Sequence, residues 1–478
     1  MIKKYCFRTF IMSLLLAVSL TACDDENIVP DNTGGNTEIP DDYEEPAYSE
    51  DGDFRSESVS RVDHDVSNPD EWIKEEGELP SFSFMLKVKE QIEGDLRLEI
   101  LGLEPGSNKI RWSVRKDFIN PQAGSSFEGF LTPETLPAPG YYICKVMLNG
   151  TEIKSFNVMF DMLHSNAEPD CHPDFLSFWE KALADLAKVP MDAEMVLSKE
   201  HSSENYNVYF VKLKSAGDFT GDFVEIRGWY VEPAVGDRFA VQFVCAGYDN
   251  PNKPLTVPVS TPGPDKALLV MSPRGQGENC RNGIVNPYGD WFMSKLGYED
   301  EFYYRGAYLD QVRAIEFLAS LDKIDKEKIY CTGGSQGGCL AVAAAALCSE
   351  KLCFAAADFP FMGNFPLYLK TAGWPNNLVN RVVKNEGISK DHIISSLSYF
   401  DTKNLATMIH CPILIQMTLQ DAIAPPWTQS PIILNLPENT ERQWSMDPDN
   451  AHGGGPEMRE ELNEFIERNL SLPFWKNR

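Results

Sequence analysis

The stretch at residues 329–340 contains the side chain with the clearest chemical potential in this chain, the hydroxyl of Ser335. It lies in a Gly-x-Ser-x-Gly pattern at residues 333–337. The apolar residues before it are typical of a buried strand, and the Ala-rich residues 341–346 after it are typical of a helix. A serine on such a sharp strand-to-helix turn, a nucleophile elbow, stands clear of the sheet and can attack an ester carbonyl. The pattern alone also fits an ordinary glycine-rich turn. The presence of a base and an acid that could activate Ser335 must therefore distinguish the two interpretations.

Glycines at 333 and 337 remove side chains that would collide in so tight a turn. The helix that follows directs its free N–H groups back at the serine, and the Gln336 N–H is one of them. Such donors can stabilise the negative oxygen of a tetrahedral intermediate. We therefore expect Gln336 to supply one amide of an oxyanion hole.

A serine needs a base to take its proton, and the base needs an acid to orient it. The chain order in α/β-hydrolases is serine, then acid, then histidine. The histidines that follow Ser335 are His392, His410 and His452. His410 directly precedes the strand that should deliver the acid, and His392 lies further upstream in a predicted helix. His452 lies in a glycine-rich loop after the last predicted strand, so it is the predicted base.

The acid should follow a late strand and precede His452. Asp421 is the sole acidic residue in the loop after the apolar run at 412–417. A loop aspartate is more often a helix cap or a turn former, but the order constraint favours Asp421 as the triad acid.

The second oxyanion donor should come from the loop after an early strand. The run at 243–248 ends in a glycine turn, which makes the Tyr248 N–H the candidate. The Tyr248 ring could also wall the acyl pocket and contact substrate; the alternative is an aromatic residue on a surface turn.

Strands and helices that must position these residues alternate from Asp174 to the end of the chain. Helices are predicted over 174–189 and 309–321, and strands over 223–231, 240–244, 267–271, 412–417 and 443–446. This alternation predicts an α/β hydrolase domain over 166–478, with a mostly parallel sheet and helices on both faces.

A different pattern precedes that domain. Period-two runs occur at 83–88, 96–100, 110–114, 141–146 and 156–160, with Pro-Gly and Asn-Gly turns between them. They predict a small all-β sandwich, immunoglobulin-like, over 81–165. Its aromatic residues are more typical of a core than of a carbohydrate-binding surface.

Residues 1–22 have the pattern of a signal peptide, with basic residues before an apolar run at 11–20 that is too short to span a bilayer. The run ends in Leu20-Thr21-Ala22-Cys23, which resembles the bacterial lipobox and implies cleavage before Cys23 and its lipidation. Acyl chains on Cys23 would anchor the protein to a membrane. A plain secretory signal is the alternative.

Residues 23–80 are predicted to form an acidic disordered tether. The acidic residues directly after Cys23 resemble the surface-export signal of Bacteroidetes lipoproteins. We therefore expect a lipid-anchored protein of the bacterial cell envelope, at the outer membrane and exposed on its surface. For these acidic residues, the alternative is that they are simply the first residues of a solvated linker.

The composition limits the choice of partners. The chain has 43 basic and 71 acidic residues in 478, a formal charge of −28. So acidic a protein is unsuited to nucleic acid or an anionic membrane surface and fits uncharged substrates. Eleven cysteines occur mostly in apolar contexts, without zinc-ligand spacing, so we expect buried thiols and no metal.

Several motifs converge on one family. The chain resembles the acetyl xylan esterase and cephalosporin C deacetylase family, carbohydrate esterase family 7, over about residues 166–478. The resembling segments are 274–277, 304–310, 333–338, 358–361, 419–421 and 452–454. The resemblance implies an α/β-hydrolase fold, no cofactor, and removal of acetyl groups from sugars. It carries over the nucleophile to Ser335, the acid to Asp421, the base to His452 and the oxyanion amides to Tyr248 and Gln336.

The chain departs from this family in two respects. The His-Gly-Tyr turn of the family reads Ala246-Gly247-Tyr248 here, which changes the wall at the histidine position. The β-domain and the tether lie outside the resemblance. The family often forms hexameric rings, which implies a homo-oligomer as one assembly state.

The sequence therefore predicts a serine esterase that deacetylates xylan or related oligosaccharides through an acetyl-enzyme. One alternative is a serine peptidase of the prolyl-oligopeptidase type, for which residues 81–162 are too short to form the usual propeller. Another is a glycan-binding surface lipoprotein without catalysis, against which the intact triad order argues. The sequence does not name the polymer, the acetylated position or the acyl length.

Overall fold

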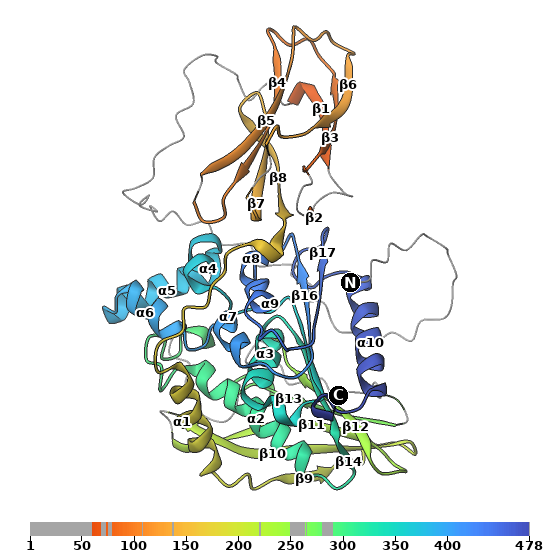
Figure 1. The fold of residues 1–478 in the computed structure, drawn as a ribbon, viewed down its shortest axis with the longest axis vertical. Coiled ribbons are helices and arrows are strands. Elements are labelled where there is room, and N and C mark those ends of the chain that lie inside the picture. Colours follow the sequence, from red (N-terminus) through yellow and green to blue (C-terminus); the bar gives the residue numbers. More distant parts are fainter. Residues whose placement is uncertain are drawn as a thin grey trace. The chain divides into compact units, whose positions relative to one another are not determined.

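The computed structural model describes residues 60–477 except 68–72, 75–78, 108, 136–137, 219–220, 249–262, 264 and 280–289. All described residues belong to one compact unit (Figure 1). The predicted signal peptide, the predicted lipidation site Cys23 and the acidic residues after it lie outside the described residues. No helix among those described has both the length and the apolar character needed to cross a membrane.

Residues 62–160, the β-rich region, form two sheets. The first has the order β1-β3-β6 and contains β1 (Val62–Ser67), β3 (Phe82–Val88) and β6 (Ser126–Leu131). The second has the order β2-β8-β7-β4-β5 and contains β2 (Ile73–Lys74), β4 (Leu96–Leu103), β5 (Ile110–Phe118), β7 (Gly140–Leu148) and β8 (Thr151–Phe160). All pairs are antiparallel except the short parallel pair β2–β8.

Alternation along each strand builds the core between these sheets. In β3 the buried residues occupy every second position from Phe82 to Val88, as a strand with one face inward requires. Phe82 of the first sheet stacks on Trp112 of the second, with ring centroids 5.8 Å apart. The sandwich fold expected from the sequence is confirmed. Strand β1, however, lies within the stretch expected as tether and pairs with β3.

The larger sheet has nine strands in the order β17-β16-β15-β14-β12-β13-β11-β10-β9. The strands are β9 (Glu194–Leu197), β10 (Tyr206–Asp218), β11 (Gly221–Pro233), β12 (Phe239–Cys245), β13 (Lys266–Met271), β14 (Ile324–Gly334), β15 (Phe354–Asp358), β16 (Ile413–Thr418) and β17 (Arg442–Asp447). The pairs from β17 through to β13 are parallel, and β11, β10 and β9 extend one edge antiparallel. The expected α/β-hydrolase fold is therefore confirmed.

Helices cover both faces of this sheet. They are α1 (Phe175–Ala187), α2 (Tyr303–Ser320), α3 (Gln336–Cys348), α4 (Phe365–Thr371), α5 (Gly373–Glu386), α6 (Lys390–Leu397), α7 (Thr402–Leu405), α8 (Pro426–Gln429), α9 (Pro431–Leu434) and α10 (Pro456–Ser471). Helix α3 packs on β14 and β15 and is buried along its whole length. On the opposite face, the ring of Phe465 in α10 packs edge-on against the ring of Phe354 in β15, with centroids 5.4 Å apart. Helix α2 begins at Tyr303, six residues before the predicted start.

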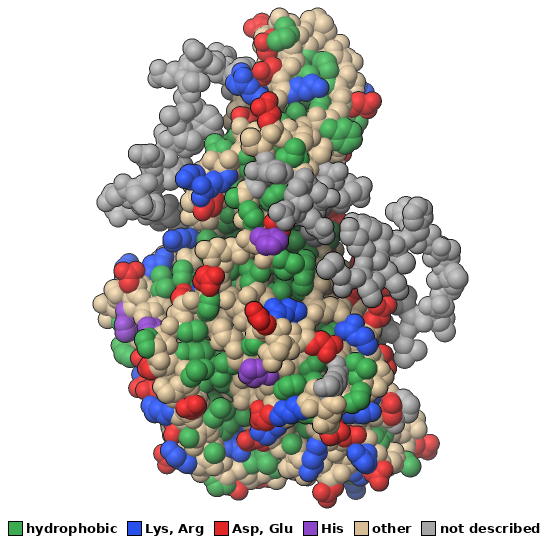
Figure 2. Space-filling model, in the orientation of Figure 1, with side chains coloured by type: hydrophobic (Ala, Val, Ile, Leu, Met, Phe, Trp, Pro, Cys, Tyr) green, Lys and Arg blue, Asp and Glu red, His purple; other side chains and the backbone are tan. Residues whose placement is uncertain are grey.

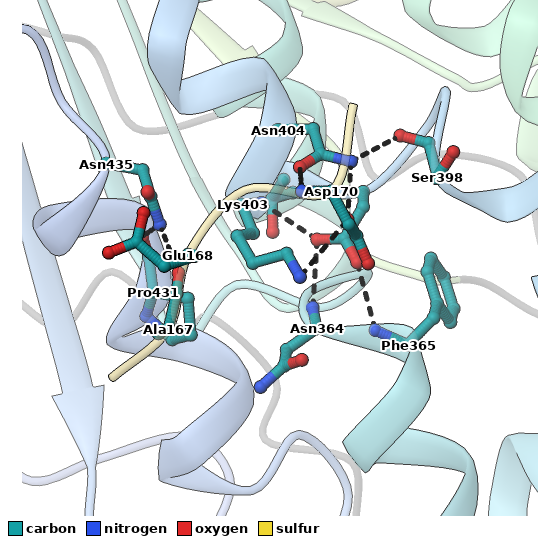
Figure 3. Close-up of polar contacts among 12 residues, drawn as sticks. Ala167, Glu168, Asp170, Asn364, Phe365, Ser398, Lys403, Asn404, Pro431 and Asn435 are labelled. Atoms are coloured by element: carbon teal, nitrogen blue, oxygen red, sulfur yellow. Dashed lines mark hydrogen bonds and ion pairs between the residues drawn. The ribbon is translucent and has the colours of Figure 1, made fainter. Parts of the chain in front are cut away.

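The chain between β8 and α1 is fastened to the helices by a partly buried polar network (Figure 3). Asp170 forms an ion pair with Lys403 at 3.1 Å. The Asp170 N–H donates to Asn404 Oδ1 at 3.0 Å, and Asn404 Nδ2 donates back to the Asp170 carboxylate at 2.9 Å. Because Lys403 is buried, this ion pair and its hydrogen bonds hold the connecting chain in one place.

Asp401, beside this network, caps two helices at once. Its carboxylate accepts the N–H groups of Asn364, Phe365 and Lys403 at 2.8–2.9 Å. Burial raises the pKa of Asp401 to about 6, against the lowering effects of Lys403 and the N–H of Phe365. These bonds fix the start of α4, which lies next to the site described below.

The eight described cysteines are free, and all but Cys171 are buried. They act as small apolar side chains in the core. On the face drawn in Figure 2, acidic and basic side chains are interspersed.

Candidate active site

Ser335 occupies the turn between β14 and α3, with φ 58° and ψ −120°. A side chain at Gly333 would place its Cβ 2.4 Å from the carbonyl oxygen of Gly337. One at Gly337 would lie 2.2 Å from the carbonyl oxygen of Cys245. Both glycines are therefore required for the turn, and Ser335 holds a positive φ that non-glycine residues rarely adopt.

His452 lies between Ser335 and Asp421 and contacts both. Its Nε2 is 2.8 Å from Ser335 Oγ, and its Nδ1 is 2.7 Å from Asp421 Oδ2. With the proton on Nδ1 donated to Asp421, Nε2 is left to accept the serine hydroxyl. The structure thus brings together three residues that the sequence separates by up to 117 positions.

The carboxylate of Asp421 is fully buried and surrounded by donors. Its Oδ1 accepts the N–H groups of Ile423 and Ala424 at 2.8 and 2.9 Å. Its Oδ2 accepts the hydroxyl of Thr418 at 3.1 Å and Nε2 of Gln429 at 3.3 Å, besides His452. A buried carboxylate that is so fully hydrogen-bonded has little freedom to rotate.

The loop that carries His452 is fastened by Asp447. Asp447 Oδ1 accepts the Asn450 N–H at 3.0 Å, and Oδ2 accepts the Gly455 N–H at 2.7 Å. The imidazole meets the ring of Phe359 edge-on, with centroids 5.0 Å apart. The loop is therefore closed on itself, and Phe359 limits the movement of the ring.

The two expected oxyanion donors lie on neighbouring segments. Gln336 begins α3, so its N–H is in the first turn, where helical N–H groups lack an intrahelical acceptor. Its side chain donates from Nε2 to the carbonyl oxygen of Gly247 at 3.1 Å. Gln336 Oε1 in turn accepts the Tyr304 hydroxyl and Gln276 Nε2, both at 3.0 Å. This buried cluster joins the elbow to the turn that carries Tyr248.

The Tyr248 ring belongs to a polar and aromatic wall that sequence reasoning found only in part. Its hydroxyl donates to Asp290 Oδ1 at 3.1 Å and accepts the Trp291 N–H at 3.0 Å. Trp374 Nε1 donates to Asp290 Oδ2 at 3.4 Å. The Trp374 ring meets the Tyr248 ring edge-on, with centroids 6.3 Å apart. Burial and the Asp290 carboxylate raise the pKa of Tyr248, so its hydroxyl stays a donor.

Asp290 and Trp374 carried no signal in the sequence. Asp290 follows no predicted strand, and Trp374 lies in the stretch 363–380 that pattern reasoning does not place. Their aromatic and carboxylate types, close to the elbow, would fit a sugar-binding wall only once the fold is known. Within the described residues, no group of three or more His, Cys, Asp or Glu side chains could hold a metal.

Comparisons with known proteins agree with this architecture. A family model described as acetyl xylan esterase (AXE1) matches residues 154–469. A curated protein named acetyl esterase Axe7A, from Xylanibacter ruminicola, is 24% identical over 316 residues, which is 63% of this chain and 68% of that protein.

Two solved structures have the same fold. An acetyl xylan esterase from Paenibacillus sp. R4 is 27% identical, with a TM-score of 0.55, and the match covers 64% of this chain and 98% of that one. Acetyl xylan esterase 1 from Thermoanaerobacterium sp. JW/SL YS485 is 20% identical, with a TM-score of 0.54, and the match covers 63% and 95%.

Proposed function

Since the chain belongs to the acetyl xylan esterase family and is thus a carboxylic ester hydrolase, we propose that it is a serine esterase acting through an acetyl-enzyme. Its substrates would be acetylated xylan or related oligosaccharides, with activity of the cephalosporin C deacetylase type. One observation supports the serine mechanism above the others. Ser335 Oγ lies 2.8 Å from His452 Nε2, whose ring is bonded through Nδ1 to the buried Asp421.

In the first step, Ser335 Oγ attacks the acetyl carbonyl carbon while His452 Nε2 takes the hydroxyl proton. Asp421 stabilises the imidazolium that forms. The carbonyl oxygen becomes an oxyanion, to which the N–H groups of Tyr248 and Gln336 would donate. The tetrahedral intermediate then breaks its bond to the sugar oxygen, which leaves as a hydroxyl with the proton from His452.

In the second step, a water molecule gives its proton to His452 and attacks the acetyl carbon. The second tetrahedral intermediate breaks the bond to Ser335 Oγ, which recovers the proton. Acetic acid leaves and loses its proton to solvent as acetate, and the enzyme returns to its starting state. Every proton and electron pair is accounted for by side chains of this chain, so the proposed reaction needs no cofactor.

The choice of acetyl esters is supported by the names of the relatives, an acetyl esterase and two acetyl xylan esterases. The wall formed by Tyr248, Asp290 and Trp374 offers aromatic faces and a carboxylate beside the elbow. These are the groups that contact the apolar face and the hydroxyls of a sugar.

The test is release of acetate from acetylated xylan and of nitrophenol from 4-nitrophenyl acetate, by the full chain and by Ser335→Ala. We expect turnover by the first only. A proline-containing peptide amide assayed in parallel would favour the peptidase alternative if it were cleaved. Xylan binding by the full chain without any turnover would favour a glycan-binding protein.

We also propose that the protein is lipidated at Cys23, anchored to the bacterial outer membrane and displayed on its surface, with assembly into a homo-oligomer. The lipobox-like residues 20–23 and the acidic residues after them support this placement. Radiolabelled palmitate should enter the full chain expressed in a bacterium and should not enter Cys23→Ala.

A further inference from the structure

We propose that Asn157 of strand β8 is a positioning residue for the triad acid, because it fastens the loop of Asp421 to the β-rich region. The inference rests on the proposed function, since Asp421 matters to catalysis only if the triad operates. Asn157 lies 263 residues before Gln420, the residue that directly precedes Asp421.

The side-chain amide of Gln420 pairs with the backbone of Asn157 in the way that a neighbouring strand would. The Asn157 N–H donates to Gln420 Oε1 at 2.8 Å, and Gln420 Nε2 donates to the Asn157 carbonyl at 3.0 Å. The Asn157 side chain adds a third bond, from Nδ2 to the carbonyl of Leu419 at 2.9 Å. Both residues before Asp421 are thus held by a single residue of β8.

The same contact reaches the loop of the base. Gln420 Nε2 also donates to the carbonyl of Pro448 at 3.0 Å, and the Leu419 N–H donates to the Asp447 carbonyl at 2.8 Å. Asp447 organises the loop that ends at His452, as described above. Asn157 therefore lies at the outer end of a connected set of bonds that fixes the acid loop and the base loop together.

A second contact joins the β-rich region to the other side of the acid. Tyr141 of β7 meets the ring of Trp427 in α8 edge-on, with centroids 6.1 Å apart. The same helix carries Gln429, whose Nε2 donates to Asp421 Oδ2. The β-rich region thus supports Asp421 from both the preceding loop and the following helix.

Thr418 at the end of β16 and Gln429 of α8 hold the Asp421 carboxylate only through its Oδ2 atom. The backbone N–H donors to its Oδ1 belong to the same loop and would move with it. The bonds to Asn157 fix that loop against a separate part of the fold. Displacements of about 1 Å can reduce catalysis about 100-fold, so loss of this support should lower kcat while the substrate wall remains intact.

The experiment compares Asn157→Ala and Gln420→Ala with the full chain and with Ser155→Ala. Ser155 is an exposed residue two positions earlier on the same strand, so it controls for changes to β8. Active sites are first counted with a fluorophosphonate that labels the reactive serine. Per labelled site, we expect kcat on 4-nitrophenyl acetate to fall about 10-fold in Gln420→Ala, which removes the bonds to the Asn157 backbone and to Pro448, with KM within about twofold. Asn157→Ala removes only the bond to Leu419, so its kcat should fall by a smaller factor, about 3-fold.

Asn157→Asp separates positioning from bulk. It keeps the size of the side chain but replaces the donor to Leu419 with an acceptor. We expect its kcat to fall at least as far as that of Asn157→Ala. Wild-type kcat per labelled site in all three variants would overturn the proposal, and so would a loss that disappears once labelled sites are counted.

Hydrogen exchange gives a readout that does not depend on activity. Peptides covering residues 419–424 should exchange faster in Asn157→Ala and Gln420→Ala than in Ser155→Ala, whereas those from α3 should not change. Unchanged exchange at 419–424 would overturn the inference. Failure of the proposed function would instead show as an inactive wild type or an active Ser335→Ala, and the exchange result would still decide whether Asn157 holds the acid loop.

Discussion

The side-chain amide of Gln336 donates a hydrogen bond to the carbonyl oxygen of Gly247, 3.1 Å away. This bond joins the residue after the nucleophile to the residue before Tyr248. The peptide between Gly247 and Tyr248 is trans, so its N–H points away from its carbonyl. One side chain therefore orients the peptide that presents the second expected oxyanion donor.

We predict that Gln336→Ala lowers kcat on 4-nitrophenyl acetate about 10- to 100-fold, because the Gly247 peptide loses its partner while the N–H of residue 336 remains. Steady-state kinetics on the purified variant checks this. Gln122→Ala, at an exposed position of the β-rich region, is the control and should behave as wild type. A Gln336→Ala enzyme with wild-type kcat would show that Tyr248 is held by other contacts.

The proposed triad predicts severe and non-additive losses. Ser335→Ala and His452→Ala should each lower kcat by about 10⁴- to 10⁶-fold, and Asp421→Asn by about 10⁴-fold, because the hydroxyl is no longer activated. The double variant of Ser335 and His452 should be no worse than either single one. If the losses multiplied, the residues would act independently and the mechanism would be wrong.

The elbow predicts a contrast between two glycines. Gly337→Ala places a methyl group 2.2 Å from the Cys245 carbonyl, so it should destabilise the fold by about 3 kcal/mol and abolish esterase activity. At Gly221, the first residue of β11, the nearest atom to a new methyl group is 4.0 Å away. Gly221→Ala should therefore remain within about 0.5 kcal/mol of wild type. Urea unfolding of both proteins measures the difference.

Asp358 predicts a pH-dependent stability. The Oδ1 atom of Asp358 is a buried acceptor without a hydrogen-bond partner among the described residues. The same holds for Oε1 of Gln416, the residue opposite Asp358 on β16. Burial raises the pKa of Asp358 to about 7. A proton on this carboxyl stabilises the folded state, and this contribution is present below about pH 4 and lost as the pH rises through about 7.

Asp358→Asn removes this titration. We expect the variant to be more stable than wild type by about 2–4 kcal/mol at pH 8 and the difference to shrink towards zero at pH 4. Chemical unfolding of both proteins across this range provides the measurement. A difference that is the same at both pH values would mean that the carboxyl titrates normally.

Much of this fold could be predicted from the local sequence, because the spacing of apolar residues indicates where strands and helices form. The strands at β3, β4 and β7 were predicted near their observed bounds, as were helix α1 and the strand–turn–helix at Ser335. The predicted runs at 110–114 and 156–160 covered only about half of β5 and β8. Strand β10 was missed, although it pairs with β11 over nearly its whole length. It follows another strand directly, so the alternation of strand and helix did not indicate it.

Chain order was sufficient to select Ser335, Asp421 and His452, which the structure brings within hydrogen-bonding distance. It could not reveal contacts between segments without a motif. The pairing of Asn157 with Gln420 spans 263 positions and depends on the packing of two sheets. The bonds of Asp290 to Tyr248 and Trp374 likewise arise only when two loops and the start of α5 meet.

Helix α3, which begins directly after Ser335, is packed on all sides. All of its residues are buried, and the alanines at 343–345 have no exposed surface. Added methylene groups in so dense a region cost about 1–3 kcal/mol each. Attempts to engineer this enzyme for bulkier esters should therefore leave α3 unchanged and diversify the loops that carry Tyr248 and Asp290 and the start of α5 at Trp374.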